Sequence, residues 1–286
     1  MTKIVSFINL KGGVGKTTVT VNIASILAQK YGYKVLVVDL DPQTNATVSL
    51  ISQEHWQERS RAKQTLYDMF YDLLNNEKNF NINSAILKNV SDIDNLALLP
   101  SSLDLVQIQD NIPEISNKEY INFVDVLANQ LERVKAQYDY ILIDCPPNLG
   151  AITLNGINIS DYYIIPTVPD ILSKIGINLI LNRIDQFVEK KHSCNIKLAG
   201  LIFTKVDART NLHASTKREL RDTEELEALV FENEMPTRIS IAEAPVDSRP
   251  HVNSSTARSK SDYRATHQLI VDITDEFIEK IEAMEE

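Results

Sequence analysis

Cysteine is scarce in this 286-residue chain, which contains only Cys145 and Cys194. Two thiols cannot form a disulfide framework or, by themselves, a zinc cluster, so we expect both to be reduced and buried. The five histidines are scattered and show no metal-ligand spacing. No apolar run reaches the length of a membrane span, and residues 1–10 lack the pattern of a signal peptide. These absences predict a cytoplasmic protein that does not span a membrane.

Positive charge is also in short supply. The chain has 29 Lys and Arg against 39 Asp and Glu, which gives a net charge of −10. This balance excludes a uniformly basic nucleic-acid binder, although it leaves room for a local basic patch on an acidic body. Hydrophobic residues make up 43% of the chain and charged residues 24%, which is typical of a globular protein.

Apolar strands alternate with amphipathic helices along the chain. Continuous apolar runs such as YILIDC at 140–145 suit strands that are covered on both faces. The predicted strands lie at 3–9, 33–41, 96–100, 140–145, 162–168 and 197–204. The predicted helices lie at 17–30, 64–74, 117–138, 151–160, 170–190, 212–231 and 257–284. We therefore expect an α/β fold with a doubly wound, mostly parallel sheet flanked by helices, in one domain spanning 1–286. The polar stretch at 52–63 is predicted to be a flexible insertion.

A glycine-rich loop joins the first predicted strand to the first helix. Its sequence, KGGVGKTT at 11–18, allows backbone N–H groups to surround phosphate oxygens at the positive end of the helix. Lys16 is expected to reach the β- and γ-phosphates, and the Thr17 hydroxyl to bind Mg²⁺. Leu10 stands where the strict P-loop pattern has its first glycine, and Lys11 opens the loop instead. The predicted nucleotide contacts are Lys11, Gly12, Gly13, Val14, Gly15, Lys16, Thr17 and Thr18.

Carboxylates end two of the predicted strands. Asp144 closes YILIDC, at the place where a Walker B aspartate holds Mg²⁺, usually through water. Asp39 and Asp41 end the second strand, on opposite faces or at its exit. One of these two can support the metal shell while the other positions a water for in-line attack. Solvated loop acids are a weaker interpretation, because Asp39 lies inside an apolar run where an unpaired charge is costly.

Together these motifs resemble those of the ParA/MinD family of deviant Walker A P-loop ATPases. KGGVGKTT is similar to the family's phosphate loop, DLDPQTNAT at 39–47 to its second acidic motif, and DCPPNLG at 144–150 to its Walker B motif. The resemblance continues through TLYDMF, LALLPSSLDL, TKVDARTN and IAEAP, so it covers nearly the whole chain. The middle motifs favour the plasmid and chromosome partition branch, ParA/Soj.

The resemblance implies an ATPase that uses ATP and Mg²⁺ and works as an ATP-sandwich homodimer. Lys11 matches the signature lysine that crosses to the partner subunit's nucleotide. A second lysine so close to Lys16 would repel it unless highly charged phosphate lay between them. Donated in trans, a lysine neutralises transition-state charge only when two subunits meet. The residues that match catalytic positions are Lys11, Lys16 and Asp41, and those that match metal positions are Thr17, Asp39 and Asp144.

The segment at 204–210 bears on the choice of base. Its start, TKVD, also resembles the guanine-reading motif of GTPases, but the continuation DART is closer to a segment that lies near adenine in partition ATPases. We therefore expect ATP rather than GTP, with Asp207 and Pro236 beside the base.

Binding to double-stranded DNA is expected to be sequence-independent and to use a local basic patch. The chain departs from the family at 235–248, where Thr237 and Ser240 replace two arginines, Arg238 lies one place on, and Ser248 replaces a common glycine. A solvated helix face is the alternative interpretation of each basic residue. The candidate DNA contacts are Lys205, Lys217, Arg218, Arg221, Arg238, Arg249, Arg258, Lys260 and Arg264.

The leading hypothesis is a nucleoid-associated partition ATPase whose dimer leaves DNA when a ParB-type adaptor stimulates hydrolysis. The chain begins directly at the first strand, so we expect no N-terminal helix-turn-helix domain. A MinD-like membrane-cycling ATPase would need a basic amphipathic C-terminal helix, and residues 269–286 are acidic. A metabolic synthetase or an iron protein on the same scaffold is the third hypothesis. An iron protein requires cluster cysteines, and packing explains Cys145 better.

Overall fold

A mostly parallel sheet forms the centre of the structure, a computed structural model that describes residues 1–111, 123–207 and 209–285. The eight strands follow the order β3-β4-β2-β5-β1-β6-β7-β8, and each neighbouring pair is parallel except β3 with β4. The strands are β1 (Lys3–Phe7), β2 (Val35–Asp39), β3 (Leu87–Lys88), β4 (Leu96–Leu99), β5 (Tyr140–Asp144), β6 (Tyr162–Thr167), β7 (Lys197–Val206) and β8 (Met235–Pro236). The predicted doubly wound sheet is confirmed.

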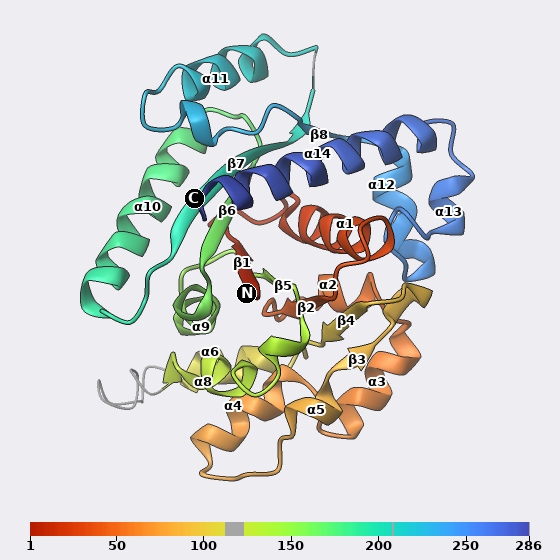
Figure 1. The fold of residues 1–286 in the computed structure, drawn as a ribbon, viewed down its shortest axis with the longest axis vertical. Helices are drawn as coiled ribbons and strands as arrows, with labels where there is room; N and C mark the ends of the chain where they lie inside the picture. The colour runs from red at the N-terminus through yellow and green to blue at the C-terminus, as the bar shows by residue number, and fades with distance from the viewer. Residues whose placement is uncertain (112–122, 208, 286) are drawn as a thin grey trace.

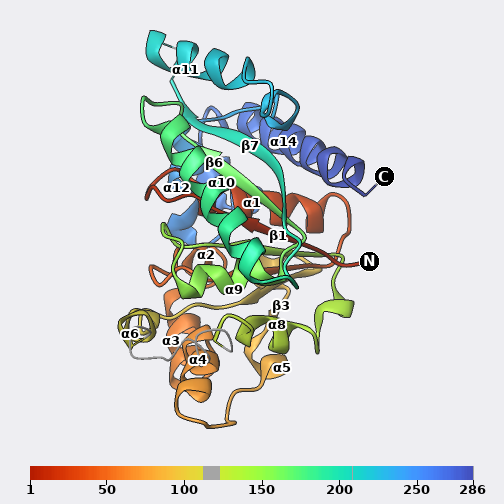
Figure 2. The same cartoon turned by 90° about the vertical axis from the view of Figure 1, so that its left-hand side faces the viewer.

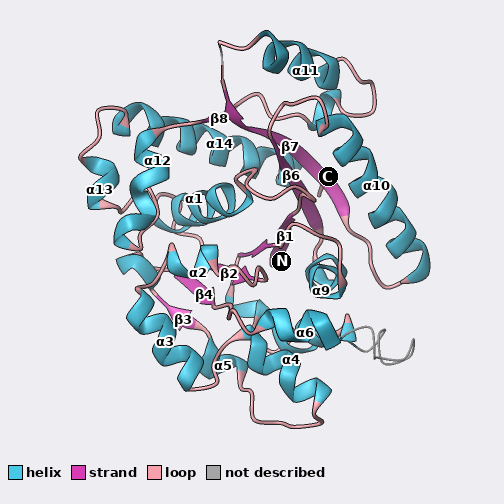
Figure 3. Ribbon diagram, turned by 180° about the vertical axis from the view of Figure 1, so that it is seen from behind, coloured by secondary structure: helices cyan, strands magenta, loops and turns pink. Residues whose placement is uncertain are grey.

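Helices cover both faces of this sheet (Figure 1). Seen from behind, the strands form a layer with helices on either side (Figure 3). The helices are α1 (Lys16–Gln29), α2 (Asn45–Val48), α3 (Gln53–Arg61), α4 (Leu66–Leu74), α5 (Ile82–Ala85), α6 (Leu105–Asn111), α8 (Val126–Leu131), α9 (Ala151–Ile159), α10 (Ser173–Lys190), α11 (Asn211–Arg221), α12 (Ile239–Glu243), α13 (Ser255–Arg258) and α14 (Tyr263–Ala283).

Alternation along the strands produces two separate apolar cores. In β1, Val5 and Phe7 belong to the core that α1 and α14 cover, whereas Ile4 belongs to the core under α4, α8, α9 and α10. The strands are therefore apolar on both sides, which is why they appear in the sequence as unbroken apolar runs. None of the helices in the described ranges is long and apolar enough to cross a membrane.

The stretch at 52–63, predicted to be a flexible insertion, is instead the helix α3. The Ser52 hydroxyl accepts a hydrogen bond from the backbone N–H of His55 (3.2 Å) and so caps the helix start. Trp56 anchors the helix, because its indole N–H donates to the carbonyl of Ser101 at 3.0 Å. No residue of α3 is fully buried, so the sequence carries no apolar stripe by which to recognise it.

Two predicted helices are divided by tertiary contacts. The helix predicted at 212–231 ends with α11, because Phe231 donates its backbone N–H to the carbonyl of Leu201 in β7 (2.9 Å). The helix predicted at 257–284 consists of α13 and α14. Between them, Asp262 accepts a hydrogen bond from the backbone N–H that begins α12 (3.1 Å). In both places local periodicity is overridden by packing and capping.

Smaller differences concern one helix and the edges of the sheet. Of the helix predicted at 117–138, residues 117–122 lie outside the described part, and the remainder contains α8 and a 3-10 turn at Lys135–Gln137. The short strands β3 and β8 were not predicted, since two residues are too few to show a pattern.

We predict that Gly200→Ala lowers the free energy of unfolding by about 2 kcal/mol, because overpacking forces neighbouring groups to move. A Cβ at Gly200 would overlap a ring carbon of Phe231 and lie 2.9 Å from the carbonyl oxygen of Leu229. Gly176→Ala on α10 is the matched control, since a Cβ there meets nothing within 4 Å and alanine favours a helix. Urea unfolding measures both variants, and equal midpoints would contradict the prediction.

Candidate nucleotide-binding site

The phosphate loop lies between β1 and α1, at the edge of the sheet where the parallel strands end. Gly13 and Gly15 have φ angles of 72° and 88°, which strain any residue with a side chain. From β7, the Thr204 hydroxyl donates to the carbonyl of Val14 at 2.5 Å. The shape of the loop therefore depends on its glycines and on a strand far away in the sequence.

The amine of Lys16 lies inside the curve of this loop. It donates to the carbonyls of Asn9 and Lys11, each at 3.3 Å, and the residue is 6% exposed. Burial lowers the pKa of Lys16, whereas the charges of Asp144 and Asp41 raise it. Asn9 was not singled out by the sequence analysis, yet its side chain donates to a carbonyl of β6 (2.7 Å) and accepts from the backbone N–H of Lys11 (2.9 Å).

Three carboxylates lie together beside the loop. The pairing of β2 with β5 places Asp39 opposite Asp144, on strands about 4.8 Å apart. Alternation along both strands directs these two side chains toward the core that α1 covers, and Thr17 of α1 donates its hydroxyl to Asp144 at 2.6 Å. Asp41 follows at the exit of β2 and is 7% exposed. The predicted metal and catalytic acids are thus neighbours.

Burial makes the ionised form of these acids costly, and a bound cation would favour ionisation. Burial raises the pKa of Asp39 to about 7 and holds the pKa of Asp144 well above its ordinary value, with the charge of Asp39 adding to the latter. One carboxylate oxygen of Asp144, Oδ1, is buried without a hydrogen-bond partner among the described residues. Magnesium prefers carboxylate and hydroxyl oxygens, so Asp144 and Thr17 fit a divalent cation.

The carboxylate of Asp39 is held by hydrogen bonds from neighbouring residues. The backbone N–H and hydroxyl of Thr47 donate to its Oδ2 at 2.8 and 2.7 Å. Ser101, after β4, donates its N–H to the Thr47 hydroxyl (3.0 Å) and its own hydroxyl to the carbonyl of Asp41 (2.8 Å). Both oxygens of Asp39 already accept hydrogen bonds, since Oδ1 accepts from the N–H of Asp41 at 3.2 Å. Asp39 therefore suits a supporting role, and Thr47 and Ser101 are site residues that the sequence analysis missed.

Lys11 differs sharply from Lys16 in its surroundings. Its side chain is 55% exposed and forms an ion pair with Asp170, just before α10. Asp170 also accepts hydrogen bonds from the Leu172 N–H (3.1 Å) and the Ser173 hydroxyl (3.0 Å). The pair joins residues that are 159 positions apart, so Asp170 could not be assigned to the site from the sequence.

The two residues predicted to flank the base lie at the ends of adjacent strands. Val206 of β7 pairs with Pro236 of β8, and Asp207 follows Val206 directly. The carboxylate of Asp207 accepts hydrogen bonds from the guanidinium of Arg209 at 2.9 and 2.8 Å. This bidentate pair lowers the pKa of Asp207.

The predicted DNA contacts fall into two groups. Ion pairs with acidic neighbours hold Lys217, Arg221, Arg249 and Lys260. The amine of Lys217 lies 2.8 Å from each carboxylate oxygen of Glu234. Arg258 donates to the carbonyl of Val252 at 3.0 Å. The other four are exposed and take part in none of the ion pairs seen in the described ranges: Lys205, Arg218, Arg238 and Arg264.

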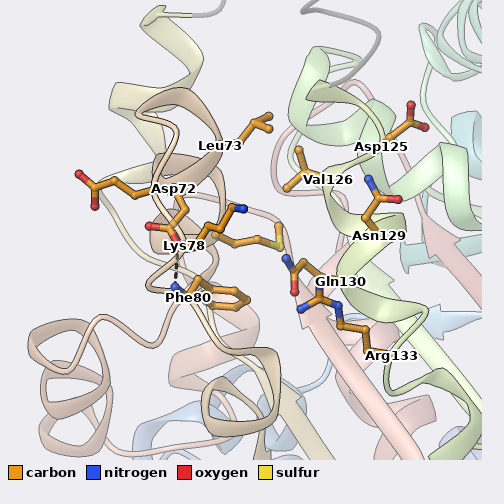
Figure 4. Close-up of a pocket in the computed structure, with 11 residues that line it drawn as sticks. Asp72, Leu73, Lys78, Phe80, Asp125, Val126, Asn129, Gln130 and Arg133 are labelled. Atoms are coloured by element: carbon orange, nitrogen blue, oxygen red, sulfur yellow. Dashed lines mark hydrogen bonds between the residues drawn. The ribbon is translucent and has the colours of Figure 1, made fainter.

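A cavity of about 580 Å³ lies elsewhere, between α4 and α8 (Figure 4). Met69, Phe80 and Val126 form apolar parts of its lining, and the Phe80 backbone N–H donates to Asp72 at 2.6 Å. The lining includes no residue of the phosphate loop or the acid cluster, so this cavity is separate from the nucleotide site.

Comparisons with known proteins agree with this geometry. A family model described as an AAA domain matches residues 2–199. The sporulation initiation inhibitor protein Soj of Bacillus subtilis is 33% identical over 251 residues, which cover 87% of this chain and 90% of the relative. The chromosome-partitioning ATPase Soj of Treponema pallidum is 32% identical, with coverages of 87% and 89%. The chromosome partitioning protein ParA of Myxococcus xanthus is 30% identical, with coverages of 87% and 80%.

Solved structures share the fold. Cobyrinic acid a,c-diamide synthase from Mycobacterium smegmatis, with bound ADP and magnesium, has a TM-score of 0.66 and 28% identity, covering 87% of this chain and 91% of that one. A Borrelia burgdorferi protein assigned to plasmid partition and bound to AMPPNP has a TM-score of 0.72 and 24% identity, with coverages of 98% and 100%. The nucleotides and magnesium bound in these neighbours agree with the predicted cofactors, ATP and Mg²⁺.

We predict that Asp144→Asn weakens the binding of Mg²⁺ and nucleotide without lowering the stability of the free protein. Without metal, removing one buried acid leaves the free energy of unfolding unchanged or raises it by about 1 kcal/mol. With Mg²⁺ and AMPPNP at about 100 times the dissociation constant, the wild type gains about 3 kcal/mol and the variant gains clearly less. Thermal unfolding with EDTA and with ligand provides the comparison. Asp185→Asn, an exposed change on α10, is the control and keeps the full gain. An undiminished gain in Asp144→Asn would contradict the assignment.

Proposed function

The chain belongs to the ParA/MinD family of P-loop ATPases, in the branch of Soj and ParA, and from this premise we propose that it is an ATPase that partitions DNA. One observation carries the proposal: a single phosphate loop holds two lysines with opposite environments. Lys16 is buried within the loop, and Lys11 is exposed at its mouth. The Soj and ParA relatives, 30–33% identical over 87% of this chain, support the assignment.

In the proposed activity the chain binds ATP through the loop at 11–18, with Lys16 against the terminal phosphates. Thr17 and Asp144 would hold Mg²⁺, and Asp39 would have a supporting role beside them. When bound, the ion neutralises charge on the phosphates. Asp41 lies at the edge of this cluster and would orient an attacking water. ATP is proposed rather than GTP, because the continuation DART at 207–210 is closer to a segment that lies near adenine in partition ATPases.

We infer that the active form is a homodimer with two ATP molecules between the subunits. Lys11 extends from the loop toward solvent rather than into its own loop, so it is free to serve a facing subunit once it leaves Asp170. A lysine contributed in this way stabilises transition-state charge only in the dimer. Hydrolysis is then slow in the monomer and limits the lifetime of the dimer.

The dimer is proposed to bind double-stranded DNA without sequence preference. Against a net charge of −10, one subunit offers only scattered exposed cations, and pairing two subunits doubles them. A ParB-type adaptor would stimulate hydrolysis and release the dimer, which places the protein on the nucleoid in the cytoplasm. We assign the whole of this role to one domain spanning 1–286.

Substitution of the two lysines is predicted to affect different steps, namely ATP binding and ATP hydrolysis. Lys16→Ala abolishes ATP binding, because the loop loses the charge that faces the phosphates. Lys11→Ala retains ATP binding, but DNA- and adaptor-stimulated hydrolysis falls by about 10³-fold, by analogy with an arginine finger. Equilibrium binding of a fluorescent ATP analogue and a phosphate-release assay separate these effects. Equal loss of binding in the two variants would show that Lys11 serves its own loop.

DNA affinity is predicted to depend on the exposed cations and not on the paired ones. Arg218→Gln and Arg264→Gln each weaken ATP-dependent DNA binding and reduce the slope of log affinity against log salt by about 1 per subunit. Lys217→Gln is the matched control, and it acts on stability through Glu234 while leaving the salt slope unchanged. Fluorescence anisotropy across a salt series measures the slopes. An absence of DNA binding with either ATP or ADP would instead favour a metabolic synthetase, the activity named for the Mycobacterium neighbour.

A further inference from the structure

A cavity of about 390 Å³ lies at the opposite edge of the sheet from the phosphate loop. It is formed where β2, β4 and β5 begin and where β3 ends, and these four strands are neighbours in the sheet. The N-terminus of the chain lies at the same end, because β1 also begins there (Figure 2). The lining residues are Lys34, Lys88, Asn89, Asn95, Leu96, Ala97, Gln137 and Tyr138. None of them belongs to the phosphate loop or the acid cluster, so this cavity is separate from the nucleotide site.

Strand pairing holds the walls of this cavity in place. The register of the sheet places the residues just before β2, β4 and β5 side by side. The backbone N–H of Val35 donates to the carbonyl of Asn95 at 2.8 Å. The backbone N–H of Asp139 likewise donates to the carbonyl of Lys34 at 2.8 Å. Because main-chain hydrogen bonds between neighbouring strands fix these walls, the cavity is preformed, as small-molecule sites usually are.

Two lysines line this cavity and have no acidic partner in the described ranges. Lys34 precedes β2 and Lys88 ends β3, and neither amine takes part in the ion pairs seen there. The carboxylate of Asp139 accepts a hydrogen bond from the backbone N–H of Lys34 (2.8 Å) and does not pair with its amine. The lining itself contains no acidic residue. A hollow lined by charge of one sign concentrates positive potential, so it attracts an anion even on a chain of net charge −10.

A buried hydroxyl and three amides complete the polar lining. Tyr138 is 9% exposed, and its hydroxyl makes no hydrogen bond with another of the described residues. Burial raises the pKa of Tyr138, so the hydroxyl stays protonated and can donate. The amides of Asn89, Asn95 and Gln137 can each donate and accept. The Asn89 side chain is held by the backbone N–H of Asn95, which donates to its amide oxygen at 3.2 Å. A buried hydroxyl without a partner costs free energy that a ligand oxygen would recover.

We propose that this cavity binds a small phosphorylated sugar. A phosphate monoester carries a charge of about −1.5 to −2 at pH 7, which matches two lysines, and lysine acts toward phosphate as a point charge. A carboxylate carries a single charge and would leave one lysine uncompensated. The amides and the phenol supply the donors and acceptors that sugar hydroxyls require. The volume also lies within the range of about 300–1,000 Å³ that is typical of small-molecule sites.

Calorimetric titration with glucose 6-phosphate tests the proposal. The wild type should bind it with a dissociation constant below about 1 mM. Lys34→Gln and Lys88→Gln should each weaken binding about 10-fold, because each removes a charge-assisted contact. Tyr138→Phe should weaken binding about 5-fold through loss of the hydroxyl. Its urea midpoint should match that of the wild type, since the ring is retained. Glucose, which lacks the phosphate, should bind at least about 10-fold more weakly than glucose 6-phosphate.

Two matched variants show whether binding takes place in this cavity. Lys197→Gln removes an exposed lysine that begins β7, at the same end of the sheet but outside the lining, and should bind glucose 6-phosphate as the wild type does. Lys16→Ala removes the amine within the phosphate loop and should also bind as the wild type does, because the two sites lie at opposite edges of the sheet. Equal weakening in Lys197→Gln would reduce the effect to general surface charge, and loss of binding in Lys16→Ala would assign it to the phosphate loop.

Three further results would overturn the inference. If the wild type shows no binding up to about 10 mM glucose 6-phosphate, the cavity does not take this class of ligand. If inorganic phosphate binds as tightly as glucose 6-phosphate, the amides recognise no hydroxyls and the lysines hold an adventitious ion only. If Lys34→Gln and Lys88→Gln leave glucose 6-phosphate binding unchanged but weaken the binding of duplex DNA, these lysines serve the DNA backbone instead.

Discussion

Burial of two carboxyl groups at one edge of the sheet is the constraint on which the rest of this structure depends. Parallel pairing of β2 with β5 aligns Asp39 with Asp144, and neither carboxylate reaches water. Two such groups cost the fold free energy unless something positive accompanies them, and Lys16 is the buried amine nearby. The arrangement is understandable as a site for Mg²⁺ and phosphate. The cation would neutralise the carboxylates, and the phosphate would pair with the amine of Lys16.

In the proposed dimer, Lys11 would extend this pairing of phosphate with lysine from one subunit to two. Lys16 is enclosed by its own loop, whereas Lys11 stands at the mouth and is held by Asp170, just before α10. The buried lysine and the exposed lysine of the phosphate loop therefore lie at the same edge of the sheet. Under the proposed function, an acidic chain that its own copies repel elsewhere would associate through this edge and present its exposed cations to DNA.

Much of the fold could be predicted from the sequence because strands covered on both faces are unbroken apolar runs. The phosphate loop and the acids at strand ends were equally visible, since each carries its chemistry in a short segment. Features that arise only from tertiary contact were not visible. Asp170 meets Lys11 across 159 positions, Thr47 gains its role by facing Asp39, and α3 depends on the Trp56 contact with Ser101 rather than on an apolar stripe.

The account is tested most directly by a crystal structure of the protein with Mg²⁺ and AMPPNP. It predicts a two-fold dimer in which the Lys11 amine has left Asp170 and lies within hydrogen-bonding distance of a phosphate bound to the facing subunit. A nucleotide-bound structure in which Lys11 remains on Asp170, or contacts only the phosphates of its own loop, would contradict it.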